Sequence, residues 1–386
     1  MGVRRERKAL RRLQRLSTLL LSAGVLYGVS ATVGSNSPRA AWEAFSRDEA
    51  VLTVLRWELG DLGTDSPLSL PAVMALRGVP VLLTAQDEVL SLWSKGAETE
   101  SESAEQDREG TLLQEETERQ PLHFADNGVP ARTLLPSSEK GYDVIGSVYL
   151  SNSTGYAVDP DGFDGSFAAA LGEEGPQVLI VHTHGSEAYT MPAGEEYEAS
   201  GENRTLDNTR NVVRVGEEIA AVLAEYGISA VHDRTLYDYP QYNGAYGRAL
   251  TGIESYLEKY PTVSFVLDIH RDAITDAQGQ IYKVISETEA GSAAQLTLVM
   301  GSDGSGLTHS AWRENLKLAV AVQQCLLEKH PTLMRPILLR NSRYNQHATA
   351  GSLLVEVGAA GNSLDEALLA ARLFAEGFAE TIGGEK

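Results

Sequence analysis

Residues 263–272 read VSFVLDIHRD, an apolar and β-branched run that ends in polar and charged side chains. This pattern predicts a buried strand over Val263–His270, and helical spacing over Ala245–Tyr260 precedes it. The same alternation recurs from about residue 140 onward, with strands expected at 177–182, 228–232, 296–300 and 353–357 and helices at 211–226, 312–329 and 364–382. The expected fold class is therefore α/β, with a single mixed or mostly parallel sheet and helices on both faces.

Polar clusters follow three of these expected strands directly. The first is HTHGSE at 182–187, the second is DIHRD at 268–272, and the third is the glutamate of LLVEVG, Glu356. In open α/β sheets, ligands bind outside the carboxyl ends of the strands. The three clusters are therefore expected to meet at one functional site.

Histidines and carboxylates that converge from several loops are the usual ligands of zinc. The candidates are His182, His184, Glu187 and His270. His182 and His184 are two residues apart, so on an extended chain both side chains face the same side and the strand argument does not separate them. Glu356 is the candidate proton acceptor, because a glutamate alone in an apolar strand is costly to bury without a task.

Each cluster also has a purely structural interpretation. An isolated H-x-H pair occurs often by chance. Asp268 and Asp272 are compatible with a strand-end turn and a helix cap, and Glu356 is compatible with a salt bridge to Arg271. What favours a metal site is that all three clusters end strands of one α/β domain.

The N-terminal third has a different organisation. A basic tail at residues 1–15 precedes an uncharged run at residues 16–34, LSTLLLSAGVLYGVSATVG, long enough to span a bilayer as a helix. The tail is expected to stay in the cytoplasm and the rest to lie outside it; a cleaved signal peptide is the alternative. Residues 35–95 are a membrane-proximal region, residues 96–139 an acidic disordered linker, and residues 140–386 the catalytic domain.

The formal net charge of −21 argues against nucleic acid as a partner, since so acidic a surface repels phosphate backbones. A single cysteine excludes an internal disulfide and a cysteine-based zinc site.

The sequence resembles the stage II sporulation protein P family of endospore-forming bacteria. The matching stretches are LIVHTHGSEAY (179–189), DNTRNVVRVGEEI (207–219), YGISAVHDRTLYDYP (226–240), LDIHRDA (267–273), SRYNQH (342–347) and SLLVEVGAAGNSLDEA (352–367). Together they cover about residues 177–382. The resemblance implies a zinc-dependent N-acetylmuramoyl-L-alanine amidase with an additional endopeptidase activity on peptidoglycan. It also implies action with sporulation proteins D and M during engulfment, from the cell membrane into the space between the septal membranes.

Carried over by position, the resemblance makes His182 or His184, Glu187 and His270 metal-site residues and Glu356 the general base. It places Asn208, Arg210, Arg271 and Asp272 behind the ligands or against the substrate, with Arg271 as a candidate donor to the oxyanion. One departure stands at Asn208, where related amidases carry a ligand glutamate, so Glu187 is expected to supply that carboxylate. The alternatives are a non-catalytic peptidoglycan-binding scaffold and a different metallohydrolase, such as a deacetylase or carboxypeptidase.

Overall fold

The structure is a computed structural model that describes residues 111–112, 121–172 and 174–384. The predicted basic tail, membrane span and membrane-proximal region, residues 1–95, lie outside the described residues, as does most of the acidic part of the predicted linker. No helix among the described residues is long and apolar enough to cross a membrane.

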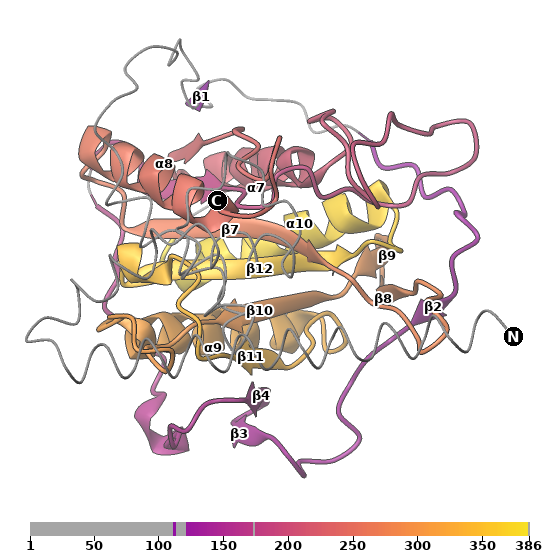
Figure 1. Cartoon of the computed structure of the whole chain (residues 1–386). Coiled ribbons are helices and arrows are strands. Elements are labelled where there is room, and N and C mark those ends of the chain that lie inside the picture. Colours follow the sequence, from indigo (N-terminus) through magenta and orange to yellow (C-terminus); the bar gives the residue numbers. More distant parts are fainter. Residues whose placement is uncertain (1–110, 113–120, 173, 385–386) are drawn as a thin grey trace, which may run out of the picture. The chain divides into compact units, whose positions relative to one another are not determined.

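A mixed sheet forms the centre of the domain (Figure 1). Within the described residues it has nine strands, in the order β1-β6-β5-β7-β12-β10-β11-β4-β3. Four of them run parallel: β6 (Ala230–His232), β5 (Val178–Val181), β7 (Phe265–Asp272) and β12 (Gly351–Ala359). The next three run antiparallel to these: β10 (Leu296–Met300), β11 (Ile337–Leu339) and β4 (Val148–Asn152). The edges are β1 (Thr111–Leu112) and β3 (Asp143–Ile145).

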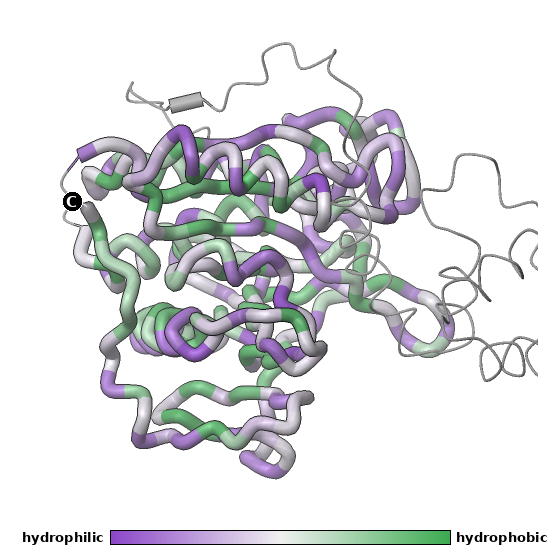
Figure 2. The backbone as a smooth tube through the Cα atoms, turned by 60° about the vertical axis from the view of Figure 1, so that its left-hand side comes forward, coloured by the Kyte–Doolittle hydropathy of each residue, from purple (hydrophilic) through white to green (hydrophobic). Residues whose placement is uncertain are grey.

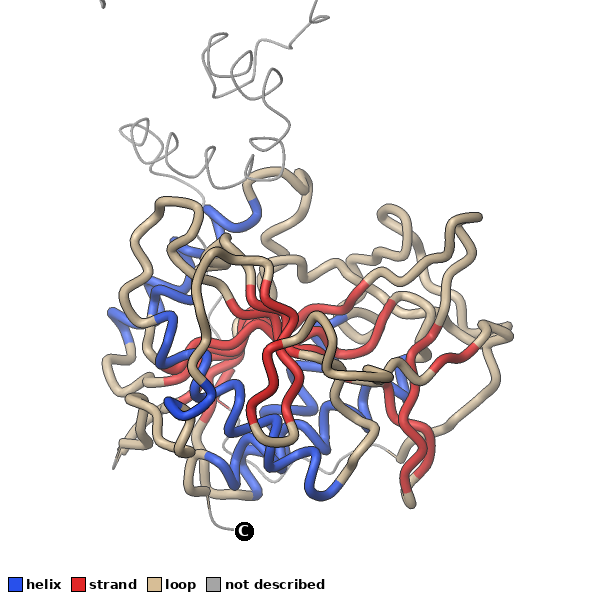
Figure 3. Tube along the Cα trace, turned by 90° about the horizontal axis from the view of Figure 1, so that it is seen from below, coloured by secondary structure: helices blue, strands red, loops and turns tan. Residues whose placement is uncertain are grey.

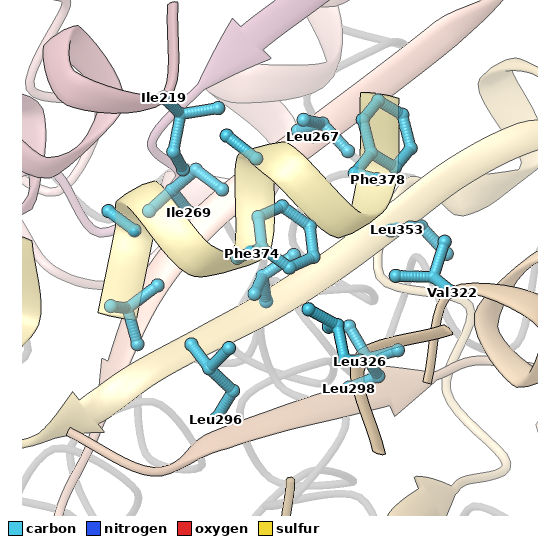
Figure 4. Packing of buried hydrophobic residues seen from close by; sticks show 14 of the residues in the cluster. Ile219, Leu267, Ile269, Leu296, Leu298, Val322, Leu326, Leu353, Phe374 and Phe378 are labelled. Carbon is cyan, nitrogen blue, oxygen red and sulfur yellow. The ribbon is translucent and has the colours of Figure 1, made fainter. Parts of the chain in front are cut away.

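Helices cover both faces of this sheet, and Figure 3 shows the twisted fan of strands between them. On one face lie α7 (Val212–Glu225), α9 (Trp312–Lys329) and α10 (Leu364–Thr381), whose apolar side chains share one core with β5, β7, β12 and β10. Phe374 and Phe378 of α10 sit at its centre (Figure 4). On the other face, α8 (Ala245–Lys259) packs a smaller apolar cluster around Ile253. The expected α/β class, with a mixed sheet between helices, is confirmed.

The sequence pattern located the helices and the central strands and missed the peripheral strands. All four helices and the five strands expected from it are present within a few residues of the expected bounds. Unexpected are β1, β3, β4, β11, the 3-10 turns at Pro160–Gly162 and Gln346–Ala348, and a three-stranded sheet of β2 (Ala131–Arg132), β8 (Lys283–Thr288) and β9 (Gly291–Ala294). In Figure 2 the inner strands are largely hydrophobic and the loops hydrophilic. The missed strands are either two or three residues long or, like β4 (VYLSN) and β8 (KVISET), mix apolar with polar residues, so this contrast is weak in their sequence.

The compact domain begins before residue 140. Strand β2 (Ala131–Arg132) pairs with β8 (Lys283–Thr288), which pairs with β9 (Gly291–Ala294), and Leu122 packs against the main core. Residues 121–139 were expected to belong to a disordered linker. They differ from the acidic run before them because apolar side chains such as Leu122 return, and these gain from burial.

The parallel centre of the sheet determines where chemistry can collect. The carboxyl ends of β5, β7 and β12 lie side by side at one edge, since β5 pairs with β7 and β7 with β12 in parallel. The clusters at 182–187 and 268–272 and Glu356 are carried on these ends.

Candidate metal centre

Three side chains converge at this edge of the sheet. One nitrogen of His184, a carboxylate oxygen of Glu187 and one nitrogen of His270 all lie within 4.8 Å of one another. Glu187 Oε1 is 3.7 Å from His184 Nδ1, and Oε2 is 3.5 Å from His270 Nδ1. The three residues are 8%, 5% and 3% exposed, respectively, so this is a buried set of ligand-type atoms.

The donor set fits a zinc ion. Two imidazoles and one carboxylate are a usual ligand set of catalytic zinc sites, and they leave a coordination position for water. His184 Nε2 is buried and has no hydrogen-bond partner among the described residues. Burial lowers the pKa of His184 to about 4, so its ring is neutral at physiological pH and keeps a lone pair for a cation.

Asp268 orients His270. Both residues are on β7, two apart, and project from the same face of the sheet. The Asp268 Oδ1 atom is 2.9 Å from His270 Nε2, and the backbone N–H and hydroxyl of Thr183 donate to its two oxygens at 2.8 and 2.6 Å. This directs His270 Nδ1 toward Glu187, which is the arrangement of a carboxylate behind a metal-binding histidine.

The charges within the cluster are strongly coupled. Burial acts to lower the pKa of His270, but the carboxylates of Asp268 and Glu187 outweigh it and hold that pKa well above its usual value. Burial acts to raise the pKa of Glu187, and His270 together with Arg271 outweighs it, so Glu187 is ionised. A bound cation would replace the proton on His270 Nδ1 as the partner of Glu187.

His182 lies away from this group. Its Nδ1 donates to the carbonyl of Ile269 at 3.1 Å, so its Nε2 accepts from His232 Nε2 at 2.8 Å. Gly216 of α7 packs directly over both rings, where a Cβ would lie 2.7 Å from His182 Cε1 and His232 Nε2. Of the two histidines that the sequence left open, the structure brings His184 to Glu187 and His270, and it places His182 under α7.

Glu356 is the neighbour of His270 on the adjacent strand, with the two residues in register on β12 and β7. Its Oε2 atom is buried without a hydrogen-bond partner in the described structure. Burial raises the pKa of Glu356 to about 8; His270 opposes this rise, and the charges of Glu187 and Asp272 add to it. A carboxyl group in this state is suited to accept and return a proton near neutral pH.

The guanidinium of Arg271 binds the loop that follows Glu187. It donates to the carbonyls of Ala188 at 3.1 Å and Asn203 at 2.8 Å, while its backbone N–H donates to Glu187 Oε2 at 3.1 Å. These contacts position Glu187 and its loop. Asp272 forms an ion pair with Arg335, with 2.7 Å between Asp272 Oδ2 and Arg335 Nη2.

The structure places Asn208 and Arg210 in two separate pockets. Asn208 donates to the carbonyl of Arg234 at 3.4 Å and lines a pocket of about 590 Å³. Arg210 lies 3.6 Å from Glu195 and lines a second pocket of about 320 Å³. Neither residue belongs to the group of three ligand-type side chains.

Two tyrosines complete the wall beside the cluster and were not anticipated. The ring of Tyr242 stacks on His184 with centroids 4.5 Å apart, and the guanidinium carbon of Arg204 lies 4.8 Å from the centroid of the same tyrosine ring. The ring of Tyr246 meets His184 edge-on at 5.5 Å. Tyr246 lies in the first turn of α8 and Tyr242 lies in the loop before it, and nothing in the sequence around QYNGAYG distinguishes them from ordinary loop and helix aromatics.

Comparison with known proteins identifies related sequences. Residues 82–379 match the model of the family described as stage II sporulation protein P. The stage II sporulation protein P of Bacillus subtilis (strain 168) is 26% identical over 216 residues, which cover 53% of this chain and 50% of that protein. The chain therefore spans about half the length of this curated relative.

Among solved structures, the matches include two N-acetylmuramoyl-L-alanine amidases. Ami1 from Mycobacterium smegmatis is 16% identical, with a TM-score of 0.34, and AmiC2 of Nostoc punctiforme is 16% identical, with a TM-score of 0.32. Each comparison covers 54% of this chain and 97% of the other.

Proposed function

The chain belongs to the stage II sporulation protein P family, and from this premise we propose that it is a zinc-dependent hydrolase of peptidoglycan that acts during sporulation. The bond cut would be the amide between muramic acid and L-alanine, with endopeptidase activity on cross-links as a further possibility for the same site. The observation that carries the proposal is the buried group of His184, Glu187 and His270, with Glu356 next to it on the adjoining strand.

His184, Glu187 and His270 would hold the ion, with Asp268 behind His270 and the Arg271 N–H behind Glu187. Bound zinc acidifies water and polarises a scissile carbonyl. Asp268 and Arg271 would keep the ligand atoms in place, which is what separates a selective site from a loose cluster.

Glu356 would move the proton. Hydrolysis of an amide adds water oxygen to the carbonyl carbon, breaks the C–N bond and delivers a proton to the departing amine. Glu356 would take the proton from the attacking water and return it to the nitrogen, because a pKa raised to about 8 makes both transfers accessible near neutral pH. His270 lies in register with Glu356, so the carboxyl group and the ligands face the same space.

Arg271 was the sequence-based candidate for stabilising the oxyanion. Its guanidinium donates to the carbonyls of Ala188 and Asn203, and these bonds favour a positioning role. Tyr246 supplies an alternative neutral donor, since burial raises the pKa of its phenol well above 10, and its ring lies edge-on to His184.

The setting of the reaction is also part of the proposal. A membrane anchor at residues 16–34 would place the domain outside the cytoplasm, in the space between the septal membranes. Sporulation proteins D and M would be its partners there. These proposals rest on the sequence of residues 1–34 and on the family, since that segment lies outside the described residues.

Zinc content and turnover, measured together on the purified chain, test the proposal. We expect about one zinc per chain, and intact peptidoglycan should release stem peptides with a new N-terminal alanine in a reaction that chelation abolishes. Release of acetate instead would identify a deacetylase. A chain that binds peptidoglycan, releases no product at any zinc concentration and is unaffected by chelation would support the non-catalytic scaffold.

A further inference from the structure

The larger pocket opens directly beside the metal cluster. It has a volume of about 590 Å³ and follows the carboxyl end of β6, the strand next to β5. Its lining residues are Leu206, Asn208, Asp233, Arg234, Thr235, Leu236, Tyr239 and Pro240. Gly185, which follows His184, packs against this wall, where a Cβ would lie 2.7 Å from Leu236 Cδ2 and 3.3 Å from the Thr235 carbonyl. The pocket and the ligand-bearing turn therefore share one wall.

Exposed apolar surface gathers at this pocket. Leu206 is 41% exposed and Tyr239 is 52% exposed, and both line it. Tyr242, 47% exposed, stacks on the ring of His184. Among the described residues, the other exposed large apolar side chains are Phe124, Leu134 and Leu135. Apolar side chains that are left exposed inside a concave surface mark a place where a ligand binds.

The polar groups that line the pocket include a buried carboxylate, Asp233, and a guanidinium, Arg234, that is ion-paired through one of its nitrogens. Asp233 is 2% exposed, and its oxygens accept from the Thr235 N–H at 3.0 Å and the Tyr237 hydroxyl at 2.6 Å. Arg234 donates to Glu217 through Nε at 3.0 Å, and this bond does not use the terminal nitrogens of the guanidinium. Its side chain is 28% exposed. A guanidinium edge of this kind binds carboxylates in a two-point arrangement.

The two halves of the proposed substrate differ in charge. A glycan strand whose lactyl groups are amidated is neutral, whereas the stem peptide carries free carboxylates and short aliphatic side chains. Leu206 and Leu236 suit the aliphatic groups, and Arg234 suits a carboxylate, so the pocket chemistry matches the peptide half.

We propose that this pocket is the subsite for the acidic stem peptide and that Arg234 selects the substrate by binding one of its carboxylates. The proposal rests on the proposed function, because it assigns one half of that substrate to one side of the metal cluster. Tyr239 and Leu206 would form the apolar floor under the peptide, and the scissile amide would lie at His184.

Calorimetric titration of the full chain with a stem tetrapeptide tests this assignment without requiring turnover. The peptide is used in two forms, with free carboxylates and with all carboxylates amidated. For the wild-type chain, we expect the free form to bind about tenfold or more tightly than the amidated form, the size of a charge-assisted contact. In Arg234→Gln this preference should disappear. In Tyr239→Ala both forms should weaken together, since that change removes ring contact without altering the charge of the pocket.

Arg132→Gln is the matched control, because Arg132 is exposed on β2, lines neither pocket and stacks on Tyr282. It should bind both peptide forms as the wild type does. An unchanged preference for the free form in Arg234→Gln would overturn the proposal. If the preference for the free peptide over the amidated one were lost in Arg210→Gln instead, the peptide would be assigned to the smaller pocket. If a neutral disaccharide bound more tightly than the peptide and this binding depended on Tyr239, the larger pocket would be assigned to the glycan.

Peptidoglycan hydrolysis by the wild-type chain is measured in parallel. If stem peptides are released while the titration shows no dependence on Arg234, only the subsite assignment fails. If the wild type releases nothing from peptidoglycan with zinc bound, the proposed function fails.

Discussion

Replacing Asp268 by asparagine should weaken zinc binding while leaving every ligand in place. The Asp268 carboxylate accepts hydrogen bonds from the backbone N–H and the hydroxyl of Thr183, and its Oδ1 atom forms an ion pair with His270 Nε2 at 2.9 Å. An asparagine side chain offers one acceptor and one donor group in the same space. The substitution therefore replaces one accepting oxygen by a donor, and the amide cannot provide the negative charge that strengthens His270 as a ligand.

The magnitude follows from the position of the carboxylate behind a ligand. Loss of such a partner typically weakens metal affinity by about 10- to 100-fold. This corresponds to about 1.4–2.7 kcal/mol of binding free energy. Because Asp268 is 4% exposed, we also expect a loss of folding stability, which circular dichroism and thermal unfolding would record separately.

Competition with a chromophoric chelator measures the zinc dissociation constant of the folded protein. Thr183→Val is the matched control, because it removes the 2.6 Å hydroxyl bond to Asp268 and leaves the carboxylate facing His270. It should lose about 1 kcal/mol of stability and bind zinc nearly as tightly as the wild type. Wild-type zinc affinity in folded Asp268→Asn would refute the orienting role, as would an equal loss of affinity in Thr183→Val.

Three further changes test other parts of the structure. Glu356→Gln should keep its zinc and lose about 10²- to 10⁴-fold in peptidoglycan hydrolysis, the usual contribution of a general base; wild-type turnover would assign the proton transfer elsewhere. Gly216→Ala should lower the free energy of unfolding by about 1–2 kcal/mol in denaturant titration, because the added Cβ would lie 2.7 Å from the His182 and His232 rings. The cost of this overpacking exceeds the roughly 1 kcal/mol that alanine gains over glycine in helix propensity. Stability equal to the wild type would show that α7 can move away from the histidine pair. His309 is 1% exposed, and burial lowers its pKa from 6.5 to about 4. Below pH 6.5 the unfolded chain therefore binds more protons at this residue than the folded chain does. The free energy of unfolding should fall by about 1 kcal/mol between pH 8 and pH 5.5 through His309. His309→Gln should show a correspondingly shallower fall with pH, and an identical pH dependence would contradict the assignment.

The α/β architecture was predictable because it depends on local patterns. Apolar runs such as that at 263–270 are long enough to show the period of a buried strand, and the helices around them show the period of an amphipathic helix. The convergence of the clusters at 182–187 and 268–272 with Glu356 was predictable for the same reason, since parallel strands bring their carboxyl ends to one edge.

The choice between His182 and His184 required the tertiary structure. Strand β5 ends at Val181 and a turn begins at Thr183, so the alternation of side chains that would place both histidines on one side does not continue through them. The turn is held by Asp268, which is 85 residues away in sequence and binds Thr183 at two atoms. His182 meets His232 instead, and His184 meets Glu187.

The same limit applies to Arg271 and to the pocket. Arg271 binds Ala188 and Asn203, which are far from it in the chain. The pocket beside Gly185 likewise joins distant segments, since Leu206 and Tyr239 both line it. Periodicity along a sequence specifies which face of its own element a residue occupies. Which side chains of other elements reach that face depends on packing between them, and that packing is a property of the folded chain alone.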